Sequence, residues 1–132
     1  MQSLPITLYT ASILGLILLY LSMNVVRYRL KKRVSFGEGK DHMMMKAIRA
    51  QANFIEYVPM IVILLGLLEA NKAHDAVLYI ISGLIIIGRI LHMMGLFSEK
   101  DVNKARFIGA SSTFLALLFA AVAGVYSYLT GL

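Results

Sequence analysis

The chain has 132 residues, of which 59% are hydrophobic and 15% are charged, and its formal net charge is +6. This composition leaves too little polar surface for a soluble protein of this size, so it predicts an integral membrane protein with one domain over residues 1–132. Cysteine is absent, which excludes a disulfide framework and means that any thiol chemistry must use a thiol brought by a ligand.

Four apolar stretches follow one another along the chain, over residues 4–26, 48–68, 76–97 and 107–129. Each has about 20 residues, the length that crosses a hydrocarbon core of about 30 Å as a helix. Backbone polar groups in lipid must bond within their own segment, so the expected fold class is an all-α transmembrane bundle of four helices. No basic residue precedes the first stretch, as one would in a cleaved signal, so this span is expected to be retained.

The basic residues gather in two of the three connectors. Eight lie from Arg27 to Arg49 and three from Lys100 to Arg106, whereas the connector after the second span has only Lys72. Positive charge stays in the cytoplasm, so we expect the first and third connectors there and both termini outside. The net charge therefore indicates topology and contact with membrane lipids, and not nucleic-acid binding. The short loops and the lack of a sorting signal favour a bacterial inner membrane.

The second span opens with KAIRAQANFIEYVPM, residues 46–60, which carries polar side chains into the membrane. At about 100° per residue, Arg49, Asn53 and Glu56 lie within about 60° of one another on one helix face. A carboxylate in lipid is costly unless it is paired, so we expect this stripe to face the bundle interior or a wet cavity. Pro59 removes a backbone donor one turn later and is expected to bend the helix.

The third span carries Arg89 and His92 one turn apart, in GRILHMMG. Arg89 lies about 12 Å from the cytoplasmic end of the span, close to the depth expected for Glu56. One interpretation is a structural ion pair between Glu56 and Arg49 or Arg89, as in a scaffold or lipid-binding protein. The surplus of arginines favours another, a small guest whose carboxylates bind arginine and whose ammonium binds Glu56.

Two further features leave alternatives open. The runs HMMM (42–45) and HMM (92–94) contain soft ligands for copper(I). Consecutive helical residues point about 100° apart, however, so packing explains most of these methionines better and no metal site is expected. Tyr57 is either a hydroxyl donor to a ligand or an aromatic residue of the membrane interface.

The fourth span has small residues at four-residue spacing, at Ala116, Ala120 and Gly124. Such a ridge lets two helix backbones approach closely. The spacing leaves open whether the neighbouring helix belongs to the same chain.

The run RAQANFIEYVP resembles the signature of the MAPEG family, the membrane-associated proteins in eicosanoid and glutathione metabolism, in which R-A-x-x-N-x-x-E-(Y/N) opens the second helix. RVS, GRILHMMG and ARFIGA extend the resemblance over nearly the whole chain. Members of this family are homotrimers that bind glutathione between neighbouring subunits, in the half of the membrane that faces the cytoplasm. The resemblance therefore implies a homotrimer, with glutathione as co-substrate and no metal.

The resemblance also implies roles for single residues. The glutathione ligands of the family's second helix are matched by Arg49, Asn53, Glu56 and Tyr57.

Other positions of the family's site lie at helix ends and in the third helix. Arg29 matches a glutathione ligand that comes from the neighbouring subunit, and Arg106 matches the arginine that stabilises the thiolate. The leukotriene-forming synthase has tyrosines where this chain has His92 and Leu96, so His92 is expected to replace a phenol as donor, with Arg89 as a further ligand. Eicosanoid synthesis is therefore not expected. The expected function is a glutathione transferase or peroxidase that acts on lipophilic electrophiles, and the alternative is the non-catalytic scaffold.

Overall fold

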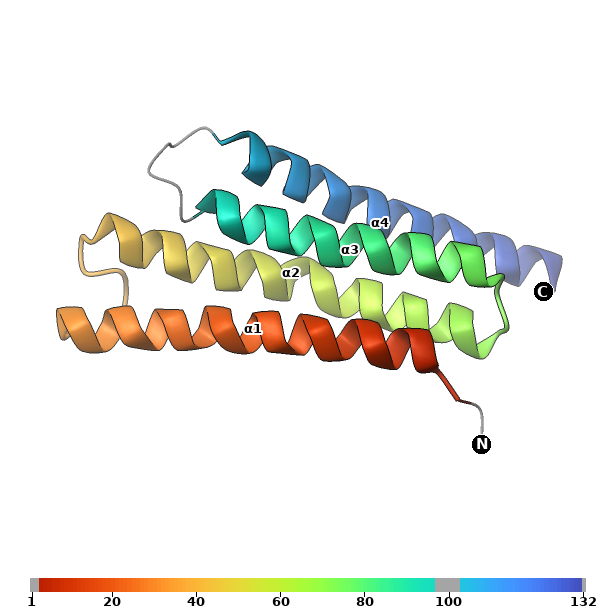
Figure 1. Ribbon diagram of the computed structural model, residues 1–132, viewed down its shortest axis with the longest axis horizontal. Helices are drawn as coiled ribbons and strands as arrows, with labels where there is room; N and C mark the ends of the chain where they lie inside the picture. The colour runs from red at the N-terminus through yellow and green to blue at the C-terminus, as the bar shows by residue number, and fades with distance from the viewer. Residues whose placement is uncertain (1–2, 97–102, 132) are drawn as a thin grey trace.

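The computed structural model describes residues 3–96 and 103–131, and within them it contains four helices and no strand. The helices are α1 (Pro5–Lys32), α2 (His42–Ala70), α3 (Asp75–Leu96) and α4 (Lys104–Thr130). All four are long and apolar enough to cross a membrane, which confirms the expected transmembrane four-helix bundle. The chain runs up and down, so that both termini lie at the end of the bundle that holds the α2–α3 connection (Figure 1).

The first connector is shorter than the sequence suggests, because α1 continues past the apolar stretch to Lys32. Arginine and lysine are good helix formers, so the helix persists beyond the hydrocarbon core. It ends at Arg33, which adopts the left-handed conformation of a helix cap. The helices therefore extend beyond the apolar stretches 4–26 and 48–68, and the loop between them covers residues 33–41 alone.

The loop is tied down at Asp41, which caps α2. Its side chain accepts a hydrogen bond of 2.8 Å from the backbone N–H of Met44 and forms an ion pair of 2.7 Å with Lys32. The bond from Lys32, followed by that from Met44, holds the pKa of the Asp41 carboxyl below its usual value. From this cap α2 runs through Pro59 as one helix.

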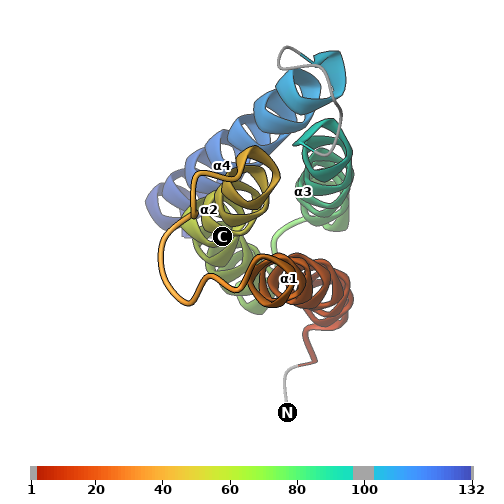
Figure 2. The ribbon, with the colours of Figure 1, turned by 90° about the vertical axis from the view of Figure 1, so that its left-hand side faces the viewer.

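The helices form a rhombus, with α2 and α3 on the short diagonal. Each of these two packs against the other three helices, whereas α1 and α4 share no contact in the described residues (Figure 2). Leu14, Phe54, Ile61 and Ile85 lie in the shared core. Ala116 and Ala120 of α4 are buried in the same core, so the helices beside these two residues of the small-residue ridge belong to this chain.

α3 and α4 come closest near the ends joined by residues 97–103. A Cβ added to Gly109 of α4 would lie 2.6 Å from the carbonyl oxygen of Gly88 and would collide with the backbone of His92. In α3, one turn after His92, a Cβ added to Gly95 would collide with the backbone of Arg106. Three glycines therefore set the distance between the two helices at this end.

Glu69, near the end of α2, caps the beginning of α1. Its two carboxylate oxygens accept hydrogen bonds of 2.9 Å and 2.7 Å from the backbone N–H groups of Ile6 and Thr7. These are first-turn donors that α1 itself cannot satisfy, and the carboxylate also interacts favourably with the positive end of the helix dipole.

We expect Glu69→Ala to lower the free energy of unfolding by about 1–2 kcal/mol, the usual effect of removing a helix cap. The measurement is chemical unfolding in detergent micelles, followed by circular dichroism. Glu38→Ala, which removes an exposed carboxylate from the loop, is the matched control and should leave stability unchanged. Equal stability of the two variants would show that Glu69 does not hold α1.

Candidate ligand-binding site

The polar stripe of α2 is divided between the outside of the subunit and its core. Glu56 lies two residues from each of the buried core residues Phe54 and Val58, so it points away from them by about 160°. Arg49 and Glu56 are both exposed, and neither forms a hydrogen bond or ion pair with another described residue. These two side chains therefore do not face the core of this chain, where the sequence analysis placed them.

Asn53 lies at the edge of the stripe and turns towards α3. Its Oδ1 accepts a hydrogen bond of 3.0 Å from Arg89. Arg89 is only 2% exposed, and its guanidinium carbon lies 5.2 Å from the centre of the Phe54 ring. The structure thus brings Asn53 and Arg89 together at a common depth. It does not form the intrachain pair between Glu56 and Arg89 that the sequence left open.

The buried face of α3 explains why Arg89 points inwards. Leu78, Ile81 and Ile85 are buried at helical spacing, and Arg89 and His92 continue the same row. The spacing of these residues in the sequence already predicts that Arg89 points into the bundle, and a cation at such a position needs a partner there.

Two buried polar atoms in this row have no partner in the described chain, Nε of Arg89 and Nδ1 of His92. No described carboxylate pairs with Arg89, so the subunit contains a buried cation without an anion. Such a charge is costly unless a further group compensates it. The cluster of Asn53, Arg89 and His92 is therefore electropositive and incompletely satisfied.

Tyr57 packs against α4 of its own chain. Its ring meets that of Phe114 edge to face, with 5.3 Å between the ring centres. This contact places the ring between α2 and α4, beside the stripe, and leaves both roles considered for its hydroxyl open.

Arg29 shapes its own loop. Its guanidinium donates hydrogen bonds of 3.1 Å and 3.2 Å to the carbonyl oxygens of Ser35 and Gly37. In the described chain no hydrogen bond or ion pair joins Arg29 to Arg49, Asn53 or Glu56. A role beside the stripe would have to be played towards another subunit, as the family resemblance implies.

Arg106 stands in the first turn of α4. Its backbone packs on Gly95 of α3, while its side chain is exposed and pairs with no described residue. Gly109, one turn later, packs on the backbone of His92, so the first turn of α4 lies beside the buried row of α3. The side chain of Leu96, at the second position of departure from the synthase, lies outside the described part of the structure.

Two features of this site were not expected from the sequence: the glycines that position it and the hydrogen-bond partner of Gln51. Gly88, Gly95 and Gly109 let α3 and α4 meet, and two glycines seven residues apart in α3 were the available signal. Gln51 donates a hydrogen bond of 2.8 Å to Ser22 and so ties α2 to α1 beside the stripe.

Met44 is completely buried and packs in the interior. Among the described residues, no group of three or more histidines, aspartates or glutamates could hold a metal ion.

Comparison with known proteins identifies relatives of the chain. A model of the MAPEG family matches residues 7–126. The inner membrane protein YecN of Escherichia coli K12 is 31% identical over 112 residues, which cover 85% of this chain and 84% of the relative. YecN of Escherichia coli O6:H1 matches with the same identity and coverage.

Proposed function

The chain belongs to the MAPEG family, and we propose that it binds glutathione, or a close thiol peptide, as a membrane-bound transferase or peroxidase of lipophilic electrophiles. The observation that carries the proposal is the pair of unpartnered charges, Arg49 and Glu56, on the outer face of a membrane-spanning helix. An uncompensated charge facing hydrocarbon costs several kcal/mol. A ligand that carries both carboxylates and an ammonium compensates both signs.

The same charges support a homotrimer, which the family resemblance also implies. α2 is about 43 Å long at 1.5 Å per residue, so Glu56, in its middle, lies well within the hydrocarbon core. Covering Glu56 requires a second subunit on this face of α2. In this arrangement Arg29 of the second subunit approaches the glutathione held by Arg49 and Glu56.

The residues of the polar stripe and of the cluster beside it each have a distinct proposed role. Arg49 binds a glutathione carboxylate through paired charge-assisted hydrogen bonds, and Glu56 receives the ammonium. Because Oδ1 of Asn53 accepts from Arg89, its amide NH2 group remains free to donate to the ligand. Arg89 thus orients Asn53, and its positive charge favours an anionic guest. Nδ1 of His92 offers one further hydrogen-bonding position.

We propose that the protein is located in a bacterial inner membrane. The YecN relatives are inner membrane proteins, and the four helices of this chain can cross a membrane. The basic residues at the adjoining ends of α1 and α2 and in the loop between them favour a cytoplasmic position for the 33–41 loop and both termini outside. The stripe then lies in the half of the membrane that faces the cytoplasm, where glutathione is available and bilayer-dissolved electrophiles can enter.

The experiment that tests the proposal is thermal unfolding of the purified protein with and without glutathione. At a hundred times its dissociation constant, glutathione should stabilise the protein by about 2.7 kcal/mol. Glu56→Gln should lose most of this stabilisation and keep its fold, because the variant cannot hold the ligand ammonium. Glu38→Gln, in the exposed loop, is the control of equal charge change and should respond like the unaltered protein.

Absence of stabilisation by glutathione would favour the scaffold hypothesis over the enzyme hypothesis. No stabilisation at millimolar glutathione, with the oligomer intact, would favour a scaffold or lipid-binding protein in which Glu56 pairs with an arginine of the next subunit. In that case Glu56→Gln should destabilise the oligomer itself, because it leaves an arginine unpaired within the membrane.

A further inference from the structure

The guanidinium of Arg89 uses few of its hydrogen-bond donors within the described chain. A guanidinium carries five N–H groups, and the one hydrogen bond that Arg89 forms with a described residue runs from Nη1 to Oδ1 of Asn53. The residue is 2% exposed, and its Nε is buried without a partner. Buried donors without acceptors are costly, so we expect a further acceptor beside Arg89.

No carboxylate of the described residues supplies this acceptor. Glu56 faces outwards, away from the core. Glu69 binds the backbone N–H groups of Ile6 and Thr7, near the opposite end of the bundle. A neighbouring subunit meets only the outside of this chain, whereas Arg89 is buried within its own chain. Glutathione compensates the charge only while it is bound, so the free protein needs another anion.

The free edge of Arg89 has the geometry of an anion site. Its Nε–H group and the neighbouring Nη2–H group point in the same direction, so one acceptor can bond to both. The Phe54 ring covers the face of the guanidinium, with 5.2 Å between the guanidinium carbon and the ring centre, and leaves the edge for the acceptor. One turn along α3, Nδ1 of His92 is also buried without a partner and provides a further hydrogen-bonding position. Because both side chains are buried in the core, the occupant has to be small.

We propose that, in the absence of glutathione, this edge of Arg89 binds one small inorganic anion, chloride, which leaves when glutathione binds. Chloride is monovalent, so it balances the single charge of the guanidinium, and it accepts hydrogen bonds from several directions. When glutathione binds beside Asn53, its carboxylates take over the compensation of Arg89. The chloride site depends only on residues of one subunit, whereas its exchange with glutathione rests on the proposed function.

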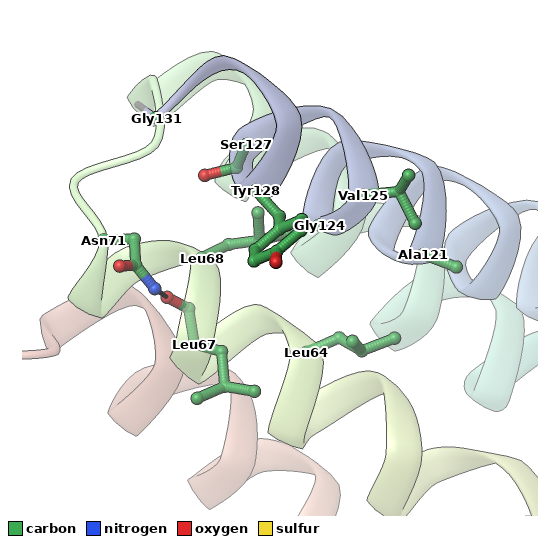
Figure 3. A pocket seen from close by; sticks show the side chains of 10 residues that line it. All are labelled: Leu64, Leu67, Leu68, Asn71, Ala121, Gly124, Val125, Ser127, Tyr128 and Gly131. Carbon is green, nitrogen blue, oxygen red and sulfur yellow. Dashed lines mark hydrogen bonds between the residues drawn. The ribbon is translucent and has the colours of Figure 1, made fainter.

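Two pockets elsewhere in the described chain are poorer sites for an anion. The groove between α2 and α4, at the end of the bundle opposite to the polar stripe, has a volume of about 750 Å³, and Figure 3 shows Tyr128 reaching from α4 towards α2 beside it. None of its described lining residues carries a charge. A pocket of about 460 Å³ is lined by Arg29 and Arg33, but Arg33 is exposed, and water screens the charge of an exposed cation. Arg33 therefore provides the control for an anion held at the surface.

Equilibrium dialysis of the purified protein against radioactive chloride tests the site, with gluconate, which is too large for the core, keeping the ionic strength constant. Without glutathione, the unaltered protein and Arg33→Met should bind about one chloride per subunit, and Arg89→Met should bind none, because its thioether has no N–H donor. Arg89→Met should fold, since an apolar side chain replaces a buried charge. Arg89→Lys keeps the charge but not the paired N–H groups, so it should bind chloride about tenfold more weakly. Saturating glutathione should also weaken chloride binding to the unaltered protein about tenfold, because the two anions compensate the same charge.

Absence of saturable chloride binding to the unaltered protein, or equal binding to Arg89→Met, would overturn the chloride site. Loss of binding in Arg33→Met alone would place the anion at the 33–41 loop and overturn it as well. Chloride binding that does not change when thermal unfolding shows glutathione to be bound would overturn the exchange. If thermal unfolding shows no binding of glutathione, the proposed function fails together with the exchange, while chloride binding that requires Arg89 would still support the site.

Discussion

Gly109→Leu is expected to lower the free energy of unfolding by about 3 kcal/mol or more, at the upper end of what a single substitution does. The atoms that a side chain would meet are the carbonyl oxygen of Gly88, at 2.6 Å from the added Cβ, and the backbone of His92. Neither can rotate away as a flexible side chain could. The helices would have to separate along the contact that places His92 beside the first turn of α4.

Unfolding in detergent micelles measures this effect, and Gly15→Leu provides the matched control. Gly15 lies on the lipid-facing side of α1, and a Cβ there meets nothing within 4 Å. Gly15→Leu also replaces a helix glycine but adds no clash, so the free energy of unfolding of this variant should stay within about 1 kcal/mol of that of the unaltered protein. Equal stability of the two variants would mean that α3 and α4 are not in backbone contact.

The consequence for ligand binding can be separated from the loss of stability. Gly109→Ala should be milder and leave enough folded protein for binding measurements. If the contact between α3 and α4 positions the site, the affinity of this variant for glutathione should fall. The affinity of the Gly15→Ala protein should not change.

The sequence predicts the architecture well because the bilayer imposes it. Apolar length and backbone satisfaction determine four helices, and the structure has them at the expected places. The helix ends were less predictable. The basic residues after Val26 form further turns of α1, since arginine and lysine favour a helix even where the hydrocarbon has ended.

The site is predictable from the sequence only in part. Periodicity places Arg49, Asn53 and Glu56 on one helix face, within about 60° of one another, and so predicts one common environment for the three side chains. In the packed bundle the same spread spans a boundary, because Asn53 reaches Arg89 while Glu56 faces outwards. Which of these directions is covered depends on what packs against the outside of the chain, and one chain's periodicity carries no information on that.

Arg106→Leu is expected to slow glutathione conjugation about 25–50-fold at pH 7, because the thiolate fraction of the bound thiol falls from about 50–75% to about 1–3%. A free glutathione thiol has a pKa of about 8.5–9, so little of it is thiolate at pH 7. A guanidinium beside the sulfur favours the thiolate by Coulomb attraction and a charge-assisted hydrogen bond. Lowering the thiol pKa by about two units requires about 2.7 kcal/mol, which one cation at low effective dielectric can supply.

The position of Arg106 supports this role. Its side chain is exposed and unpaired in the described chain, and the first turn of α4 lies beside His92 through the contact at Gly109. Asn103 Oδ1 caps this turn by accepting a hydrogen bond of 2.8 Å from the N–H of Ala105, and the positive end of the helix dipole adds a smaller favourable field for an anion. The competing explanation is an interfacial arginine that contributes only to the positive charge of the cytoplasmic side.

Titration of the bound thiol distinguishes the two explanations, by its thiolate absorbance at about 240 nm. With glutathione bound, the unaltered protein should show a midpoint about two pH units below that of free glutathione, and Arg106→Leu a midpoint near the free value. Lys104→Leu, which removes another cation from the same helix turn, should keep the lowered midpoint. Arg106→Lys should restore part of the shift, because its ammonium keeps the charge without the paired geometry. If all four proteins titrate like free glutathione, Arg106 has no thiolate role and the enzymatic proposal loses its main physical support.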